Sequence, residues 1–194
     1  AERSRLHARL RLLGVEMTAA FRDERIFQHP RRGHVEMVGV QVDSFAAFDA
    51  ALTGVERRAG GETIAEGIAV ARPSARAVQV ARRLGATTVV VGDDVVEEAV
   101  ALYLEIEKVV SEGAGAAPLA ALLAHPERFV GRKVGLVLSG GNVDLRVLAS
   151  AMLRALARTG RLTTLSVALP DRPGSLHALT GVLATQGANV VELT

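Results

Sequence analysis

The chain contains no cysteine and no tryptophan, and aromatic residues make up only 3% of its 194 residues. Without thiols it has no disulfide, no zinc–thiolate site and no thiol nucleophile. The scarcity of aromatic residues argues against binding of single-stranded nucleic acid, which stacks its bases on aromatic rings. Lysine is also scarce, with Lys108 and Lys133 alone. The net charge is only +2 and the arginines are scattered among acids, so we expect no nucleic-acid partner.

Long uninterrupted apolar runs are absent as well. No stretch reaches the roughly 18 to 20 residues that cross a bilayer, so we expect no membrane partner. No secretory segment is recognisable at residue 1, which favours a cytoplasmic protein. The five histidines form no pair with ligand spacing, so no metal site is predicted, and the Gly-x-Ser-x-Gly turn of serine hydrolases is missing. Hydrophobic residues make up 49% of the chain, enough for a sizeable core in one or two domains.

Strand-like and helix-like segments alternate along the first 160 residues. β-Branched or continuous apolar runs predict strands at residues 15–21, 35–42, 87–91 and 134–138. Apolar residues at helical spacing predict helices at residues 3–13, 44–52, 74–85, 93–111, 114–124 and 144–156. Ser44 is the expected N-cap of one of these helices, and Val110 is among the expected buried residues. The alternation predicts an α/β fold with a mostly parallel sheet.

The most informative segment lies at residues 137–144. An apolar run predicts that residues 134–138 form a strand buried on both faces, and Asp144 opens the following helix. Between them stand a hydroxyl, two glycines and an amide, namely Ser139, Gly140, Gly141 and Asn142. Strands that end in such a turn are where α/β sheets bind ligands, because glycine lets the backbone approach closely. A tight turn without a ligand remains the alternative.

Four segments, in this order along the chain, resemble one enzyme family. Residues 138–145, Leu-Ser-Gly-Gly-Asn-Val-Asp-Leu, resemble the C-terminal cofactor motif of fold-type II pyridoxal-phosphate enzymes, most closely the threonine dehydratase and serine racemase group. Residues 63–70 are similar to that group's Thr-Ile-Ala-Asp-Gly turn, and residues 112–116 supply a third match. Residues 169–176 resemble the opening of an ACT domain, a small amino-acid-sensing module. The resemblance covers about residues 35–194.

The resemblance implies an α/β, three-layer domain of the tryptophan synthase beta-like kind, followed by the start of an α+β ACT domain. We expect a partial catalytic domain at residues 1–160 and a partial ACT regulatory domain at residues 161–194. Period-two patterning independently predicts a strand at residues 162–169. A helix at residues 174–186 and a strand at residues 190–193 complete the predicted second domain.

The resemblance also implies pyridoxal 5'-phosphate as cofactor and gives roles to the motif residues. Ser139 would hydrogen-bond the pyridine nitrogen without protonating it, which gives a mild electron sink. Gly140, Gly141 and Asn142 would shape the floor of the site, and Gly67 would bring backbone close to the ring. A brace for the turn is the alternative role of Asn142, and a plain turn glycine is the alternative role of Gly67.

Further roles stay open for three residues. Glu112 would contact substrate or a cation, or stabilise the following helix through its dipole. Asp171 and Gly174 precede a predicted helix whose free N–H groups favour an anion, so we expect an amino-acid effector beside them. The cation site of some relatives is not expected, because Gln41 and Ala47 stand where those relatives have acidic ligands.

The chain departs from the family at two places. The Schiff-base lysine of these enzymes lies in a Ser-Phe-Lys-like context, and neither Lys108 nor Lys133 does. We expect both lysines to be solvated, so no catalytic residue is assigned. The family's Gly-rich phosphate loop is also missing near residues 30–33. The sequence therefore predicts part of a longer polypeptide.

The leading functional hypothesis is a pyridoxal-phosphate-dependent carbon–nitrogen lyase, a threonine ammonia-lyase that converts L-threonine to 2-oxobutanoate and ammonia. It would serve isoleucine biosynthesis or threonine catabolism under allosteric control. One alternative is a serine dehydratase or racemase. Another is a non-catalytic, ACT-type regulator that binds amino acids. The resemblance implies a homodimer or homotetramer.

Overall fold

The computed structural model describes residues 16–17 and 36–193. The predicted helix at residues 3–13 and most of the predicted strand at residues 15–21 lie outside these residues. The chain divides after Arg161 into two compact units, of which the second is residues 162–194. The identity of this second unit as an ACT domain stays a prediction.

Two pairs of parallel strands form in the first unit. β2 (Val38–Val42) pairs with β3 (Thr87–Val91) along its whole length. β1 (Glu16–Met17) pairs with β4 (Lys133–Val134). The parallel pairing of β2 and β3 confirms the prediction made from the alternation of strands and helices.

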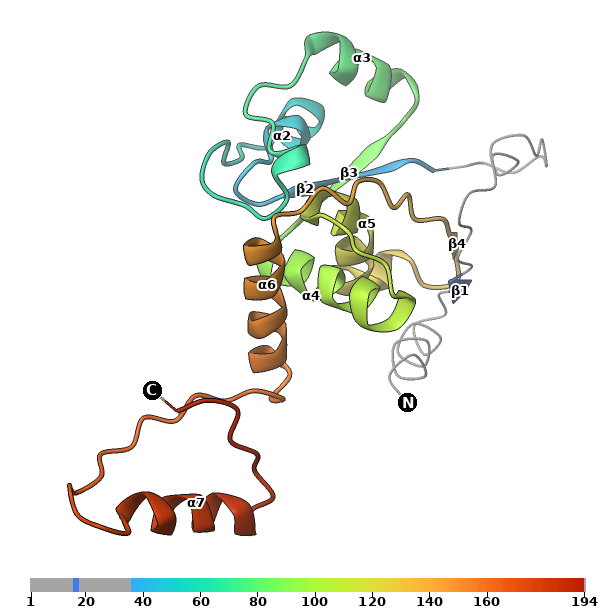
Figure 1. Ribbon diagram of the computed structural model, residues 1–194. Helices are drawn as coiled ribbons and strands as arrows, with labels where there is room; N and C mark the ends of the chain where they lie inside the picture. The colour runs from blue at the N-terminus through green and yellow to red at the C-terminus, as the bar shows by residue number, and fades with distance from the viewer. Residues whose placement is uncertain (1–15, 18–35, 194) are drawn as a thin grey trace. The chain divides into compact units, whose positions relative to one another are not determined.

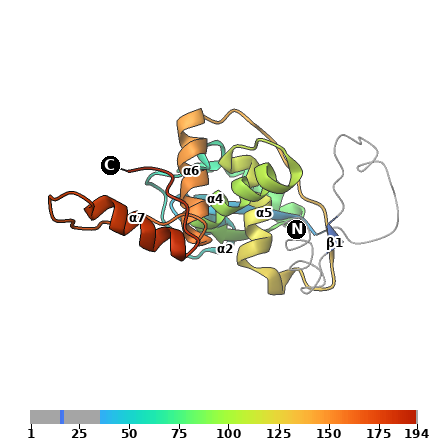
Figure 2. The same ribbon diagram turned by 60° about the horizontal axis from the view of Figure 1, so that its bottom comes forward.

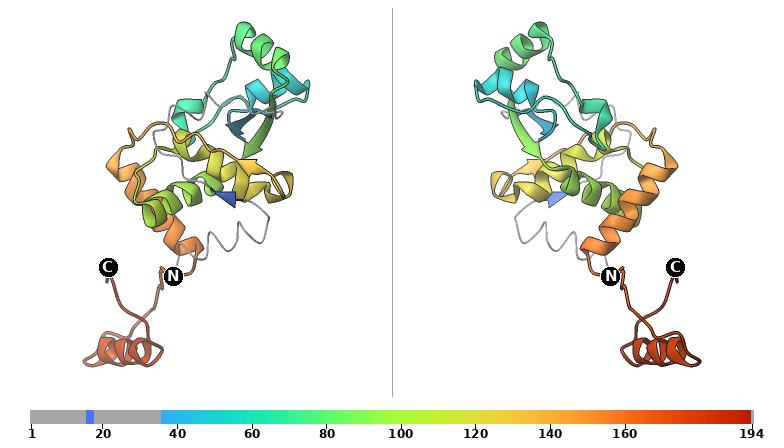
Figure 3. Two further views of the ribbon diagram at one scale, coloured as in Figure 1. Left: turned by 90° about the vertical axis from the view of Figure 1, so that its right-hand side faces the viewer. Right: turned by 90° about the vertical axis from the view of Figure 1, so that its left-hand side faces the viewer.

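Helices cover both faces of the β2–β3 pair. The described helices of the first unit are α2 (Ala47–Thr53), α3 (Ala75–Arg83), α4 (Asp93–Leu102), α5 (Gly113–Ala124) and α6 (Leu145–Arg158), with the 3₁₀ turns η2 (Glu66–Ile68) and η4 (Pro126–Arg128) and the π-helical turn η3 (Tyr103–Glu107). The α2 and α3 helices lie on one side of the strands, and α4 and α5 lie on the other (Figure 1, Figure 3). The first unit therefore has the expected three layers.

The core lies where α4 and α5 pack on the strands. Its largest buried side chains include Val42, Val96, Val100 and Leu119, each at most 1% exposed. The α5 helix is rich in glycine and alanine, and most of its residues are buried. Because its side chains are small, its neighbours come close to its backbone, as the sequence predicts.

The α4 helix begins after Gly92 and carries Asp93 and Asp94 in its first turn, where carboxylates interact favourably with the helix dipole. The sequence predicts this helix to residue 111, and that prediction is wrong. After α4 the helix continues as the π-helical turn η3. The helix ends at Lys108, whose φ of 59° is left-handed. Val110 follows this early end, and it is 46% exposed rather than buried.

The predicted cap of α2 is also wrong. The N-cap residue is Ala46, and Ser44 Oγ is buried without a hydrogen-bond partner. The helix start is held from β2 instead, because the N–H of Asp49 donates to Oε1 of Gln41 at 2.6 Å.

The segment before the Ser139 turn is less regular than predicted. Only Lys133 and Val134 form a strand, because β1 pairs with these two residues alone in the described chain. Leu136 and Leu138 pack against the core, whereas Val137 is 66% exposed. The expected strand buried on both faces is thus an extended segment buried on one side.

The α6 helix starts as predicted at Asp144, whose carboxylate accepts from the N–H of Arg146 at 2.8 Å. It buries Ala151 and Ala155 rather than its larger side chains, and Leu153 is 55% exposed. Leu148 and Met152 are partly buried and pack against the core, so the apolar spacing predicted the helix correctly.

An ion-pair cluster joins α6 to α4, which lies beside it (Figure 2). Glu97 on α4 is 7% exposed, and its two carboxylate oxygens accept from Arg154 at 2.6 Å and Arg158 at 2.7 Å. Burial acts to raise the pKa of Glu97, but the two arginines outweigh it and hold the pKa below its usual value. The cluster fixes the helix that follows the Ser139 turn.

The second unit contains α7 (Ser175–Thr185), within the predicted range. The strands predicted at residues 162–169 and 190–193 are wrong, since neither segment pairs with a strand in the described chain. Leu165 and Val191 are 63% and 78% exposed. Alternating patterning predicts a strand only where a neighbouring strand completes its hydrogen bonds.

No helix among the described residues is both long enough and apolar enough to cross a membrane.

Candidate functional site

Three of the sequence motifs meet at Glu112, immediately before α5. The N–H of Glu112 donates to the carbonyl of Gly140 at 3.4 Å. A side chain at Gly140 would overlap the Glu112 carboxylate, and one at Gly67 would start 3.4 Å from its Oε1. The Glu112 side chain therefore lies between the turn at residues 63–68 and the loop at residues 139–142.

Glycines on α5 bring these segments together. A Cβ on Gly113 would run into the carbonyl of Ile64, and one on Gly115 would run into the carbonyl of Ser139. Gly67 approaches the same helix, because a Cβ there would lie 2.9 Å from that of Ala114. The close approaches leave room for glycine alone at these three positions. The backbones of three segments far apart in sequence thus form one packed junction.

The turn at residues 63–68 is also tied to α4. Thr63 Oγ1 donates to Asp93 Oδ1 at 2.6 Å and accepts from the N–H of Ala65 at 3.0 Å. The backbone N–H of Ile64 also acts on the Asp93 carboxylate and lowers its pKa. Burial raises the pKa of Asp93 above its usual value, and nearby Asp43 acts in the same direction, although these hydrogen bonds partly oppose the rise.

The predicted cofactor residues are accessible at this junction. Ser139, Gly140, Gly141 and Asn142 are exposed, and Gly67 is exposed as well. Gly140 has a φ of 80°, a left-handed conformation that glycine adopts without strain. Within the described residues, the side chains of Ser139 and Asn142 make no hydrogen bond to the chain, so their polar atoms are free to bind a ligand. Their roles as cofactor ligands stay predictions.

Glu112 is the N-cap residue of α5 by backbone position, and its side chain makes no capping hydrogen bond. The carboxylate instead packs against the Gly140 loop. A contact with substrate and a favourable interaction with the α5 dipole both remain compatible with this position.

Both lysines are exposed, as the sequence predicts. Lys108 ends η3 and its Nζ donates to the carbonyl of Glu105 at 2.7 Å. Lys133 lies in β4. Neither lysine lies in the turns that meet at Glu112, so neither takes the place of the missing catalytic lysine.

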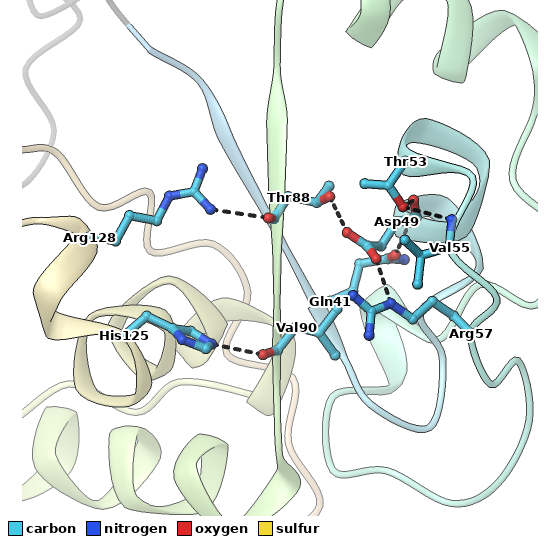
Figure 4. Close-up of polar contacts among 9 residues, drawn as sticks. All are labelled: Gln41, Asp49, Thr53, Val55, Arg57, Thr88, Val90, His125 and Arg128. Atoms are coloured by element: carbon cyan, nitrogen blue, oxygen red, sulfur yellow. Dashed lines mark hydrogen bonds and ion pairs between the residues drawn. The ribbon is translucent and has the colours of Figure 1, made fainter.

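Gln41, which the sequence excludes from a cation site, belongs to an internal network (Figure 4). Gln41 holds the backbone of Asp49, and the Asp49 carboxylate accepts from Thr88 and, at 2.7 Å, from Arg57 Nε. Burial acts to raise the pKa of Asp49, but the Thr88 and Arg57 hydrogen bonds lower it. Ala47 opens α2. No cluster of metal-binding side chains occurs among the residues that the structure describes.

Figure 4 also shows two side chains that cap the outer edge of β3. Arg128 donates to the carbonyl of Thr88 at 3.2 Å, and His125 Nε2 lies 3.0 Å from the carbonyl of Val90. These contacts occupy acceptors that an unpaired edge strand would otherwise expose.

In the second unit, Gly174 is the N-cap residue of α7 with a φ of 90°. Asp171 is exposed in the turn before it. The turn forms as predicted, and the role of these residues in effector binding stays a prediction.

Sequence reasoning missed two pairings, Thr63 with Asp93 and Glu97 with the arginines of α6. The partners lie 30 residues or more apart. In the sequence, Thr63 is recognisable only as part of a motif. Asp93 is recognisable only as the first residue of a predicted helix. No local spacing joins them.

Comparison with known proteins identifies the family of the chain. The model of the family "Pyridoxal-phosphate dependent enzyme" matches residues 17–140. The L-threonine ammonia-lyase of Thermotoga maritima is 35% identical over 161 residues, which are 82% of this chain and 40% of that protein. The L-threonine ammonia-lyase of Geobacter sulfurreducens is 33% identical over 188 residues, 97% of this chain and 41% of that protein. The chain thus spans about two fifths of the length of these relatives.

Solved structures give the same grouping. The crystal structure of the T.th. threonine deaminase superposes with a TM-score of 0.52 at 28% identity, over 57% of this chain and 36% of that one. The processed threonine deaminase isoform 2 of Solanum lycopersicum has a TM-score of 0.54 at 23% identity, over 62% of this chain and 34% of that one, and supports the fold alone. With the family match over residues 17–140, these findings show that the chain belongs to the pyridoxal-phosphate-dependent enzyme family.

Proposed function

We propose that this chain is the part of an L-threonine ammonia-lyase that receives the ring of pyridoxal 5'-phosphate. The complete enzyme would convert L-threonine to 2-oxobutanoate and ammonia. The observation that carries the proposal is the meeting of residues 63–68, Glu112 and residues 139–142 in one junction. Its support is the 33% and 35% identity to proteins named L-threonine ammonia-lyase.

The exposed loop at residues 139–142 would receive a ring that carries one acceptor nitrogen. Ser139 has a free hydroxyl that would donate to that nitrogen without transferring a proton. Gly140 and Gly141 carry no side chain to obstruct the ring, and the Asn142 amide would add a polar edge. When bound, pyridoxal phosphate supplies the electron sink for loss of the α-proton and the β-hydroxyl. Glu112 would hold the Gly140 loop in place.

The covalent attachment of the cofactor and the base that removes the α-proton need a residue that this sequence lacks. Lys108 and Lys133 are its only lysines, and neither lies in the turns that meet at Glu112. We infer that a longer natural polypeptide supplies the catalytic lysine and the phosphate loop. Because the relatives extend to well over twice the matched length, its mass should be about twice the 20.4 kDa of this chain or more.

The decisive experiment is mass measurement and assay of the natural polypeptide that contains this sequence. We expect formation of 2-oxobutanoate from L-threonine that depends on added pyridoxal phosphate. A preference for L-serine would favour the serine dehydratase or racemase instead. If no longer polypeptide exists and neither substrate reacts, the non-catalytic amino-acid-binding regulator is favoured, which the absence of a suitable lysine would then explain.

Regulation through the second unit is part of the proposal. An amino-acid effector would bind beside Asp171 and Gly174, where the N–H groups at the start of α7 favour a carboxylate. We further propose a cytoplasmic homodimer or homotetramer acting in isoleucine biosynthesis or threonine catabolism. Replacement Gly174→Val should reduce the response to isoleucine and valine more than basal turnover. An unaltered effector curve in a destabilised variant would reduce Gly174 to a turn residue.

A further inference from the structure

In the proposed function, the turn at residues 63–68 contributes only the backbone of Gly67. None of its side chains has a role there. We propose that Thr63 and Asp93 are a positioning pair that holds this turn against Glu112 and so sets the place of the Gly140 loop. The ligand part of this inference rests on the proposed function, whereas its structural part does not.

The pair joins the turn to a fixed base. Thr63 Oγ1 bonds both the Asp93 carboxylate, at 2.6 Å, and the N–H of Ala65, at 3.0 Å. Asp93 is the first residue of α4, and Val96 one turn later is fully buried. The beginning of the turn therefore cannot shift without breaking these bonds or moving the core.

From the turn, close contacts lead to the cofactor loop. Ala65 is 0% exposed, and the carbonyl of Ile64 lies directly against Gly113 of α5. Gly67 lies against the residues on either side of Gly113, and Glu112 in turn bonds the carbonyl of Gly140. Close-packed contacts of this kind transmit a displacement from one segment to the next, because no free space separates the atoms.

A purely local role makes a different prediction. If Thr63 only braces its own turn, its loss would loosen η2 and leave Glu112 unaffected. If the pair positions the loop, loss of the Thr63–Asp93 hydrogen bond would also weaken the hydrogen bond from the N–H of Glu112 to Gly140. Glu112 is separated from Thr63 by two packed contacts. Hydrogen exchange of single amides separates the two roles in the chain itself, without any activity measurement.

The test uses the natural polypeptide that contains this sequence, with Thr63→Val, which removes the hydroxyl at nearly constant shape, and Thr63→Ser, which keeps it. Thr159→Val is the matched control, because the Thr159 hydroxyl bonds only carbonyls of its own helix. The reporters are the amides of Ile68 and Glu112, whose acceptors are Ala65 and Gly140. In Thr63→Val we expect both to exchange about tenfold faster, since a hydrogen bond to a charged group is lost.

Recovery of wild-type exchange in Thr63→Ser, with no change at either amide in Thr159→Val, would support the positioning pair. Faster exchange at Ile68 with an unchanged Glu112 would overturn it, and so would no change at both. If Thr63→Val does not fold, Asp93→Ala, which removes the acceptor of the Thr63 hydroxyl, decides through the same two amides. Coupled acceleration at Ile68 and Glu112 then supports the pair, and any other pattern overturns it.

A second arm uses pyridoxamine 5'-phosphate, which carries the ring and phosphate but cannot condense with lysine. We expect its dissociation constant to rise about tenfold in Thr63→Val and to return in Thr63→Ser. If the unaltered natural polypeptide that contains this sequence does not bind this probe, the proposed function fails, and the amide exchange still decides the positioning pair. If all variants bind the probe equally, the ring-binding role stands and the pair does not position the site.

Discussion

Two helices of similar composition, α5 and α7, differ in how much of their surface is buried. Both are rich in small and aliphatic residues. In α5, Leu119 and Leu122 are 1% and 2% exposed, whereas Val182 in α7 is 61% exposed and α7 has no buried residue. The difference lies in the neighbours, because α5 packs against strands, a helix and two motif turns. Apolar composition predicts a helix, but a partner surface decides whether that helix forms a core.

Glycine substitutions should give the largest contrast between the two helices. In α5, Gly115→Ala would place a methyl group against the Ser139 carbonyl, and we expect a loss of about 1–3 kcal/mol of unfolding free energy. In α7, Gly181 has open space around it, so Gly181→Ala should stabilise the helix by about 0.5–1 kcal/mol. Denaturant titration of both variants measures the two effects. Equal effects of one sign would contradict the packing difference.

An exposed residue at the same junction should affect ligand binding rather than stability. Ser139→Ala should weaken binding of pyridoxamine 5'-phosphate roughly tenfold to hundredfold, because one hydrogen bond of about 1 to 3 kcal/mol is lost. The unfolding midpoint should stay the same, since the side chain has no partner in the fold. Ser150→Ala, on exposed α6 surface, is the control. Unchanged affinity would show that Ser139 is a turn residue only.

The ion pairs of Glu97 should make the first unit sensitive to acid. Because the folded pKa of Glu97 is lowered, its contribution is present above the unfolded pKa of about 4.3 and is lost as pH falls through the folded pKa. Glu97→Gln should cost about 1–2 kcal/mol at pH 7, less than a fully buried pair because both arginines are partly exposed. Melting curves between pH 3 and 7 should show a weaker acid dependence in the variant. A parallel shift at all pH values would contradict this assignment.

The smallest effect should come from Asp93, whose pKa is shifted the other way. Since burial raises its folded pKa, the ionised group opposes folding, and stability from this group rises as pH falls through the folded pKa. Asp93→Asn should therefore change the melting temperature little at neutral pH. It should also remove the small gain in stability that protonation of Asp93 gives as the pH falls through its folded pKa. Comparison of its pH profile with that of Glu97→Gln checks the opposite signs. Profiles of the same sign would be inconsistent with the two environments.

Local sequence rules predicted what depends on neighbouring residues. The strand at residues 87–91, the Asp144 cap and α7 follow from β-branching, capping chemistry and periodicity. They did not predict what depends on distant partners. The segment at residues 134–138 needed a neighbouring strand to become a strand, and the meeting of Gly67 with Glu112 depends on the fold of α5. The motif residues were found by their resemblance to a family, and their convergence was seen only in the structure.

The most direct test of the account is a titration of the isotope-labelled natural polypeptide that contains this sequence with pyridoxamine 5'-phosphate, followed at single backbone amides by NMR. We predict that the amides of Gly67, Glu112, Gly140 and Gly141 shift together with one saturation curve, while those of α7 do not move. Shifts confined to other parts of the chain, or no saturable shift at these four amides, would contradict the claim that the three motifs form one cofactor-binding junction.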